Sequence, residues 1–387
     1  MTPYASFGYF IFLLYPALPL LVLGFTGRLG RWSIVLVSAA VLAIQFWNPL
    51  GASGLRQLAY FAGYIVWSLA IIYGLRTRYY LAVALALLPL VAVKVLEGRA
   101  AAGGLPAGLA DTVGFLGISY LTFRVLDVIV LIHDRVLDGP PVLGELLAYL
   151  LFFPTISAGP IDRYRRFVAD LRAREGGYAA HTEKAIHRVA QGFLYKYIFA
   201  YLVYRYALQP VASQHTLGAD VIYMYAYSAY LFFDFAGYSA FAIGAGHLLG
   251  ITVPENFAGP FLSPNFREMW NRWHMTLSFW FRDHVYMRFV LGATKKRWFH
   301  GNRHAASYAG FMVTMGLMGL WHGLAWNYIV YGLFQGVMLV AYDFLSRWNR
   351  RRRALRLPAG VAKAAGILLT ANLFCFGLLI FSGHLFH

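Results

Sequence analysis

Two histidines in apolar surroundings are the residues of this sequence whose types best suit catalysis. His274 lies in RWHMTLSFWFRD and His322 lies in LWHGLAWN, so each is flanked by tryptophan and long apolar side chains. An imidazole titrates near neutral pH and can therefore take a proton from a hydroxyl or thiol group. A membrane histidine can instead be an interhelical hydrogen-bond partner, and for His274 both roles stay open. For His322, the following glycine would let a reacting group approach closely, which favours catalysis.

Other kinds of chemistry have little support in the sequence. His300 and His304 stand four residues apart in a basic loop without nearby carboxylates, and HExxH is absent, so no metal site is expected. The sequence contains no GxGxxG, P-loop or GxSxG motif, which leaves dinucleotide, ATP and serine-hydrolase mechanisms unsupported. The single cysteine, Cys375, lies in an apolar run, which excludes a disulfide framework and a cysteine-based metal site.

The composition is that of a polytopic membrane protein. Of the residues, 60% are hydrophobic and 13% are charged, and the mean hydropathy is +0.57, whereas roughly a quarter of a soluble protein is charged. We therefore expect an all-α fold with one integral-membrane domain over residues 1–387. The net charge of +17 is typical of cytoplasmic loops that lie against anionic lipid. Nucleic-acid binding is disfavoured because the basic residues are scattered through short loops.

The N-terminal part, residues 1–108, consists of apolar runs that predict four spans. Arginines follow the first and third runs, which places these loops in the cytoplasm and the N-terminus outside. The first run lacks a basic leader and a cleavage site, so it is expected to be a retained span. The predicted spans are 7–25, 32–47, 57–73 and 79–96, followed by a Gly/Ala-rich loop over 98–108.

Charged residues interrupt the middle of the chain. Arg124 and Asp127 stand at i,i+3 in an apolar segment, a spacing that predicts a pair on one helix face. Asp234 lies among small residues that suit close helix packing, and a hydrogen bond within that packing is expected. The remaining predicted segments are a span at 143–158, a surface cluster at 163–166, a polar linker at 172–187 and apolar helices at 192–208 and 222–249.

The stretch from 254 to 304 is too polar to cross a membrane. Its charged residues alternate with tryptophan and phenylalanine, which predicts re-entrant or interfacial helices lining a cavity. A span containing His322 and another over 328–345 follow. The C-terminal part, 341–387, contains a basic run at 347–356 and a last span at 361–381. A cytoplasmic basic run would leave the C-terminus outside.

Three segments resemble the membrane-bound O-acyltransferase (MBOAT) family over about residues 110–340, the expected catalytic core. They read YLFFDFAGYSAFAIGAGHLLGI, PENFAGPFLSPNFREMWNRWHMTLSFWFRDHVYM and MGLWHGLAWNYIVYGLFQG. The order of RWH and then WHG is the family's order. FFPTISAGPIDRYRRF and WNRWHMTLSFWFRDHVYMRF are most similar to the branch that transfers D-alanine to teichoic acid. Alginate-type O-acetyltransferases tend to continue into a glycine-rich LGG stretch, where this chain reads MRFVLGA.

The resemblance implies a fold and a set of site residues. The fold would contain ten or eleven transmembrane helices, with re-entrant helices, in a ring around a central funnel. His322 would be the invariant active-site histidine and His274 the second one. Residues expected to line the channel or orient a histidine, from proximity in sequence, are Trp273, Trp321, Asn271, Asp283, Asn327 and Asp234.

The resemblance also implies partners in a bacterial plasma membrane. D-Alanine would arrive from the cytoplasm as a thioester on the phosphopantetheine arm of a small acidic carrier protein, and no cofactor would be bound tightly by this chain. The D-alanine would then cross to the outer face and esterify lipoteichoic acid with help from a membrane-anchored partner protein. Arginines expected to dock the carrier protein are Arg267, Arg272, Arg282 and Arg288.

Two alternative functions remain at this stage. The same architecture could O-acetylate an exported polysaccharide from a different donor. The chain could instead be a transporter in which buried arginine, aspartate and histidine residues line a substrate path. The absence of inverted repeats and the tryptophan-rich polar segments speak against the transporter.

Overall fold

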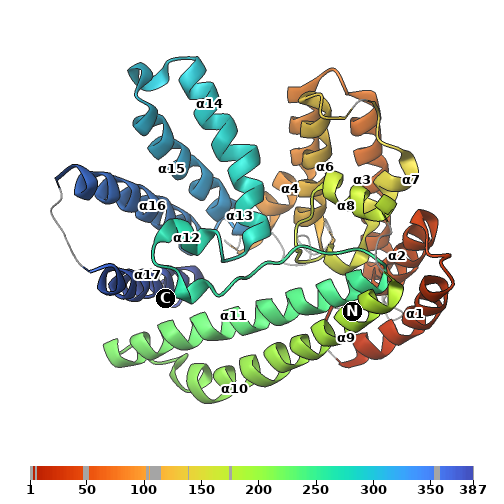
Figure 1. Ribbon diagram of the computed structural model, residues 1–387, viewed down its shortest axis with the longest axis horizontal. Coiled ribbons are helices and arrows are strands. Elements are labelled where there is room, and N and C mark those ends of the chain that lie inside the picture. The colour runs from red at the N-terminus through yellow and green to blue at the C-terminus, as the bar shows by residue number, and fades with distance from the viewer. Residues whose placement is uncertain are drawn as a thin grey trace. The chain divides into compact units, whose positions relative to one another are not determined.

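The computed structural model describes residues 3–4, 7–46, 52–101, 104, 115–137, 139–173, 177–352 and 358–386 (Figure 1). Within these ranges the chain is helical and contains no strand, which confirms the all-α class. Two compact units can be distinguished. Unit 1 comprises Met1–Phe193 and Gly237–Pro254, and unit 2 comprises Leu194–Ala236 and Glu255–His387.

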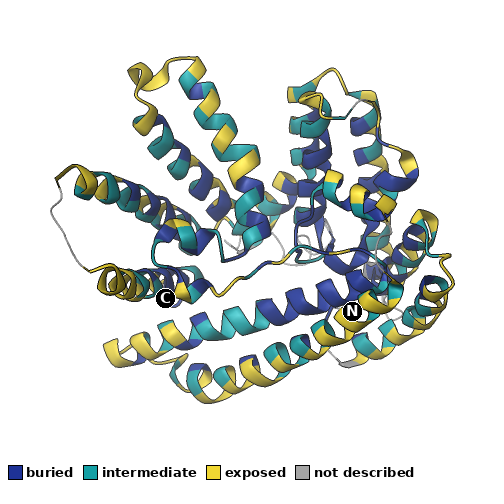
Figure 2. Ribbon diagram, in the orientation of Figure 1, coloured by how far each residue is buried: buried dark blue, intermediate teal, exposed yellow. Residues whose placement is uncertain are grey.

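Five of the described helices are long and apolar enough to cross a membrane. A helix rises 1.5 Å per residue, so about 20 residues cover the hydrocarbon core. Many of their large apolar side chains are exposed, as expected where lipid rather than protein is the solvent (Figure 2). The expected total of ten or eleven spans stays a prediction. The five helices are α1 (Phe7–Phe25), α3 (Ala52–Gly74), α4 (Tyr79–Ala101), α16 (Trp326–Arg352) and α17 (Ala359–Ser382).

Unit 1 contains the four N-terminal helices and the short helices that pack on them. α1 has the predicted bounds, whereas α3 begins five residues earlier than predicted and α4 extends into the predicted 98–108 loop. Apart from Gly104, the rest of that loop lies outside the described residues. α2 packs on α7, α4 on α6, and α1 on α9. The further elements of unit 1 are α2 (Arg31–Phe46), α6 (Ile118–His133), α7 (Leu143–Leu151), η1 (Phe153–Thr155), α8 (Tyr164–Ala173), α9 (Tyr178–Phe193) and the end of α11 (Leu217–Leu248).

Arg124 and Asp127 do not pair with each other, contrary to the sequence-based expectation. The Arg124 guanidinium is fully buried and donates to carbonyl oxygens at the end of α7, at 2.8 Å to Tyr149 and 3.0 Å to Leu150. Asp127 instead accepts from Nη1 of Arg163 at 3.0 Å. The last carbonyl oxygens of a helix have no partner within it, so a buried cation there satisfies groups that would otherwise be costly to bury.

Two other predicted segments of unit 1 take a different form in the structure. The predicted span at 143–158 is the nine-residue helix α7, about 14 Å long, and the turn η1 containing Pro154 ends it. The predicted polar linker at 172–187 is mostly helical, because α9 begins at Tyr178. Residues 174–176 of that linker lie outside the described residues.

Unit 2 contains both candidate histidines. The predicted apolar helix at 192–208 is one continuous helical run with two π-helical segments. The basic run at 347–356 is helical as far as Arg352, the end of α16, and 353–357 are not described. The further elements of unit 2 are η2 (Leu194–Ala200), α10 (Tyr201–Val203), η3 (Tyr204–Leu208), η4 (Gln209–Val211), the first part of α11, η5 (Pro260–Leu262), α12 (Phe266–Trp270), α13 (Met275–Phe281), η6 (Arg282–Tyr286), α14 (Met287–Lys295), η7 (Trp298–Gly301) and α15 (Arg303–His322).

Candidate active site

His274 lies in a strained backbone conformation at the start of α13. Its φ of 42° and ψ of 50° fall in the left-handed region, which a residue with a Cβ adopts at a cost of about 1–2 kcal/mol. The side chain is only 5% exposed, and its ring packs edge-on against Phe235 with 4.7 Å between centroids. Such strain persists only where the surroundings hold it, and it concentrates at functional sites.

Asn256 holds the two residues that follow His274 in the chain. The Asn256 carbonyl oxygen accepts from the N–H of Met275 at 2.9 Å, and its side-chain oxygen accepts from the Thr276 hydroxyl at 2.6 Å. Asn256 is fully buried. The carbonyl of His274 itself accepts from the N–H of Ser278 at 3.0 Å, within α13. These bonds fix the two residues that follow His274 and therefore the direction of its imidazole.

Trp273 anchors the other side of His274 in an aromatic cluster. Its backbone N–H donates to the carbonyl of Met269 at 2.8 Å, and its carbonyl accepts from the Ser278 hydroxyl at 3.1 Å. The Trp273 side chain is 5% exposed, so the cluster excludes water from this side of the histidine. The rings around it, at centroid distances of 5.1–6.3 Å, belong to Phe232, Phe257, Phe261 and Phe374.

His322 is the last residue of α15, and close packing against α16 shapes its surroundings. A Cβ on Gly319 would lie 2.4 Å from the carbonyl oxygen of Tyr328, and one on Gly332 would lie 2.5 Å from that of Met315. Only glycine fits at these two positions, so α15 and α16 approach closely where α15 ends.

Aromatic rings surround the His322 imidazole. Trp321 lies at 4.6 Å and Phe381 of α17 at 4.9 Å between centroids, and both contacts are close to edge-on. Tyr328 and Tyr331 lie farther away, at 6.2 and 6.3 Å. His322 is partly exposed, unlike the buried His274. The imidazole is thus accessible from one side and shielded by apolar rings on the others.

The two histidines belong to the same unit. Nδ1 of His274 is buried and has no hydrogen-bond partner among the described residues. A buried polar atom without a partner is costly unless a ligand satisfies it. The pair therefore offers one partly exposed imidazole for proton transfer and one buried imidazole that can bind a polar group.

The other residues expected to orient a histidine have partners of their own. Asn327 donates from Nδ2 to the carbonyl of Phe381 at 2.8 Å, so it positions a ring that contacts His322. Asp283 pairs with Arg282 at 2.8 Å, and Asp234 pairs with Lys196. The backbone N–H of Asn271, at the end of α12, donates to the backbone carbonyl of Arg267. A direct role of these four residues at either histidine stays a prediction.

The four arginines expected to dock a carrier protein also make ion pairs or are partly covered. Arg267 pairs with Asp343 at 3.0 Å while its side chain stays 56% exposed. Arg282 pairs with Asp283, and Arg272 lies 3.5 Å from Glu268. Nε of Arg288 is buried. Arg267 and Arg282 are therefore the most accessible of the four.

Several residues around the histidines had no signal in the sequence. Asn256 lies well before His274 in the chain, and Phe235 belongs to another helix. Phe381 was expected only as part of the last span. Apolar rings that are far apart in sequence carry no spacing signal, and Asn256 was one polar residue among many in the polar stretch 254–304.

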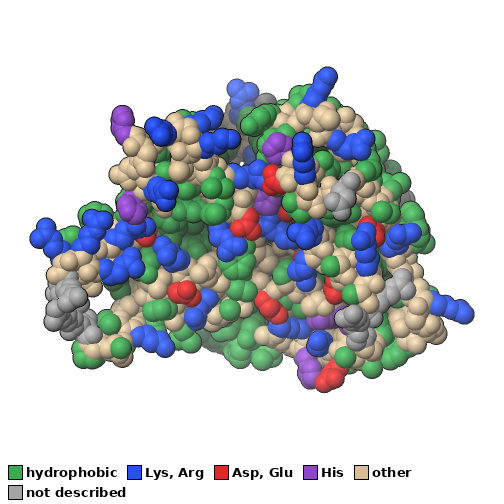
Figure 3. Space-filling view, turned by 45° about the horizontal axis from the view of Figure 1, so that its top comes forward, with side chains coloured by type: hydrophobic (Ala, Val, Ile, Leu, Met, Phe, Trp, Pro, Cys, Tyr) green, Lys and Arg blue, Asp and Glu red, His purple; other side chains and the backbone are tan. Residues whose placement is uncertain are grey.

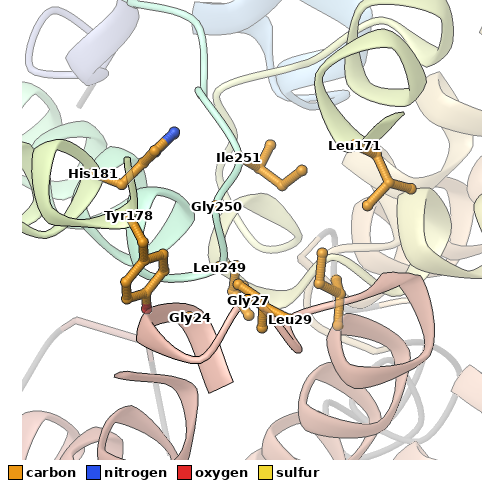
Figure 4. A pocket seen from close by; sticks show the side chains of 10 residues that line it. Gly24, Gly27, Leu29, Leu171, Tyr178, His181, Leu249, Gly250 and Ile251 are labelled. Carbon is orange, nitrogen blue, oxygen red and sulfur yellow. The ribbon is translucent and has the colours of Figure 1, made fainter. Parts of the chain in front are cut away.

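Unit 1 contains a separate cavity of about 200 Å³ (Figure 4). The Tyr178 side chain extends toward Gly24, and its hydroxyl donates to the carbonyls of Leu20 at 3.2 Å and Leu248 at 2.7 Å. His181, on the same wall, lies 3.1 Å from His247 between Nδ1 atoms. Burial lowers the pKa of His181 below the usual value, so the neutral form is favoured there.

Comparison with known proteins places this chain in a family. The family model described as MBOAT, membrane-bound O-acyltransferase family, matches residues 111–380. The teichoic acid D-alanyltransferase of Bacillus subtilis is 41% identical over 100% of this chain and 99% of the relative, and that of Lacticaseibacillus rhamnosus is 38% identical over 100% and 98%. The probable alginate O-acetylase AlgI of Azotobacter vinelandii is 33% identical over 63% of this chain and 45% of the relative. This multi-pass membrane protein is an acyltransferase and belongs to the membrane-bound O-acyltransferase family.

Proposed function

We propose that the protein transfers D-alanine to teichoic acid. The donor is a D-alanyl thioester on the phosphopantetheine arm of a small acidic carrier protein at the cytoplasmic face. The acceptor is a hydroxyl of lipoteichoic acid at the outer face of the plasma membrane, and a membrane-anchored partner protein assists the final transfer. The N-terminus lies outside in this proposal.

The extent of the similarity is the observation that carries this proposal. The relatives named teichoic acid D-alanyltransferase align with all of this chain and with 96–99% of their own length. The alginate relatives align with 58–63% of this chain. The part of the chain that the alginate relatives leave unmatched is therefore also shared with the D-alanyl branch.

The arrangement of the two histidines suits acyl transfer. His322 is partly exposed. It can take the proton of an attacking hydroxyl and pass it to the departing thiolate as the ester C–O bond forms and the thioester C–S bond breaks, or carry the acyl group transiently itself. The buried Nδ1 of His274 can hydrogen-bond the substrate. The rings of Trp321 and Phe381 exclude water that would otherwise hydrolyse an activated acyl group.

Charge favours an acidic carrier protein. The chain has 33 lysine and arginine residues against 16 aspartate and glutamate residues. On the face drawn in Figure 3, Lys and Arg side chains are spread over the surface with fewer acidic side chains among them. Complementary charge speeds association and fixes the register of a partner. Arg267 and Arg282, with side chains 56% and 53% exposed, are the proposed first contacts.

The test uses the purified protein in vesicles with lipoteichoic acid, the partner protein, and either the D-alanyl carrier thioester or an acetyl donor. We expect D-alanyl esters on the acceptor polymer and little acetyl transfer. Arg267→Glu combined with Arg282→Glu should weaken carrier binding, and the weakening should diminish at high salt. Acetyl transfer in place of D-alanyl transfer would contradict the proposal.

A second candidate is O-acetylation of an exported polysaccharide, favoured by the 33–35% identity to the alginate O-acetylases across the core. It requires the same histidine chemistry with a different donor and acceptor. The donor comparison above separates the two functions directly. Membership in an acyltransferase family disfavours the transporter.

A further inference from the structure

Two histidines and an aspartate come together where the start of α11 meets the end of α17 in unit 2. Asp220 lies in the first turn of α11, His215 lies two residues before that helix, and His384 follows α17. Their ligand atoms all lie within 4.8 Å of one another. We propose that His215, Asp220 and His384 form a Zn²⁺ site that ties the end of α17 to the start of α11.

The donor set selects the metal. Two imidazole nitrogens and one carboxylate oxygen suit Zn²⁺, whereas Ca²⁺ and Mg²⁺ prefer oxygen ligands throughout. Zn²⁺ takes four ligands in a tetrahedral arrangement, so three protein ligands leave one position for water or an exchangeable ligand. The site proposed here is therefore of the open kind rather than the closed structural kind.

The distances require only a small adjustment. Bonds of 2.0–2.1 Å in a tetrahedron place the ligand atoms about 3.4 Å apart. Nε2 of His384 lies 2.9 Å from Oδ1 of Asp220. The ligand atom of His215 lies within 4.8 Å of the other two, and His215 is exposed and precedes the helix, so its side chain can move inward. A shift of at most about 1.4 Å brings it to the tetrahedral separation.

His384 is already oriented for this role. Its ring is 4% exposed and stacks on Tyr223 at 3.9 Å between centroids with 11° between planes. Gly383 adopts a φ of 83°, which turns the chain back after α17, and the His384 N–H donates to the Ser382 hydroxyl at 3.2 Å. The His215 ring stacks on the His384 ring with 5.0 Å between centroids. One ligand is thus fixed, and the exposed ligand gives the ion access from solvent.

The cluster could not be found from spacing, because His384 is far in sequence from the other two residues. It stands against the sequence-based expectation that the chain binds no metal. Its position also has a consequence for the acyl-transfer site. His384 lies three residues after Phe381, whose ring packs on His322. Bound Zn²⁺ would therefore stabilise the segment that holds this ring.

The test measures Zn²⁺ binding to the full-length protein in detergent, purified without a polyhistidine tag and stripped with a chelator. Titration against a chromophoric chelator should give one Zn²⁺ per chain. His215→Ala and Asp220→Asn should each weaken binding about tenfold or more. Zn²⁺ should also raise the thermal unfolding temperature of the wild type.

The matched control is His300→Ala combined with His304→Ala. This variant removes two histidines that lie close to each other in the basic loop, and it should leave Zn²⁺ binding unchanged. His215 is exposed, so its replacement leaves the fold intact and keeps the test valid even if a His384 variant fails to fold. Equal Zn²⁺ affinity in wild type and His215→Ala, or loss of binding only in the His300 and His304 control, would overturn the proposal. Because the readout is metal binding, it does not depend on the acyl donor.

Discussion

The side-chain oxygen of Asn256 accepts a 2.6 Å hydrogen bond from the hydroxyl of Thr276, two residues after the left-handed His274. Asn256→Ala leaves that buried hydroxyl without this partner, so we expect a loss of about 1–3 kcal/mol in unfolding free energy. Misplacement of the imidazole should lower acyl transfer by up to about 100-fold. Thermal unfolding and transfer assays on the same preparations measure both effects.

Thr276 supplies the control for this hydrogen bond. Thr276→Ser keeps the hydroxyl and should keep most of the activity, whereas Thr276→Val should resemble Asn256→Ala. In a double-mutant cycle the two losses should be less than additive, because both substitutions break one interaction. Strict additivity would show that Asn256 does not act through Thr276.

Because the backbone at His274 is strained, substitutions at this position can distinguish a catalytic role of the imidazole from a structural role. Asparagine tolerates the left-handed region better than most residues. We therefore expect His274→Asn to be about 1 kcal/mol more stable than His274→Ala, while both variants lose about 100-fold or more of the transfer rate. The measurement pairs unfolding temperature with initial rate.

His300 gives a matched comparison, because it also has a left-handed backbone, with a φ of 54°, and it is exposed. His300→Asn should leave the transfer rate unchanged. An active, stable His274→Asn protein would remove the His274 imidazole from the chemistry and leave it a packing role.

Arg124 should be among the most important residues for the stability of unit 1. Arg124→Met removes the donor that satisfies carbonyl oxygens at the end of α7, and a loss of about 2–4 kcal/mol is expected because these groups are buried. Arg165→Met, at an exposed arginine, is the control and should change stability by less than about 0.5 kcal/mol. Similar unfolding temperatures for the two variants would contradict this assignment.

The paired histidines of the unit 1 cavity predict a dependence of local stability on pH. Burial lowers the pKa of His181 in the folded state, so below about pH 6.5 the unfolded state binds more protons than the folded state. The stabilisation is therefore present above that pH and is lost as the pH falls toward the folded-state pKa. The protection factors of α9 amides against hydrogen exchange, which correct for the slower intrinsic exchange at low pH, should fall between about pH 7 and about pH 5.

The His181→Gln variant is the control for this effect. Glutamine can still hydrogen-bond but does not titrate, so the loss of protection at low pH should be smaller in this variant. An equal loss of protection in the variant and the wild type would assign the pH effect to other groups.

Local hydrophobic patterning predicted much of the helical fold. α1 has the predicted bounds, and α4 and α17 begin within two residues of the predicted positions, because long apolar runs leave little choice in a bilayer. The partners of charged residues were not predictable from local spacing. Arg124 and Asp127 satisfy the helical i,i+3 rule, yet each binds a distant segment. Arg124 donates to a buried carbonyl of α7 and Asp127 accepts from the backbone N–H of Tyr164, because buried backbone groups without a partner would be costly.

The site was predictable only in part. His274 and His322 stood out because imidazoles are rare in apolar segments, and the Trp321 ring packs against the His322 ring. Asp283 and Asn271 were expected from proximity in sequence, whereas the observed support comes from Asn256 and Phe381. Asn256 and Phe381 come close to the histidines only in the folded structure. Their positions in the sequence show no regular spacing that would have indicated this.

The most direct test of the account is acyl transfer by the His322→Ala variant. The assay follows radiolabelled D-alanine from the carrier-protein thioester to lipoteichoic acid in vesicles that hold the partner protein. His300→Ala serves as the matched control. We predict that His322→Ala keeps normal abundance, unfolding temperature and carrier binding but loses about 100- to 10,000-fold of the transfer rate. Transfer at the wild-type rate by His322→Ala would contradict the account and remove His322 from the reaction.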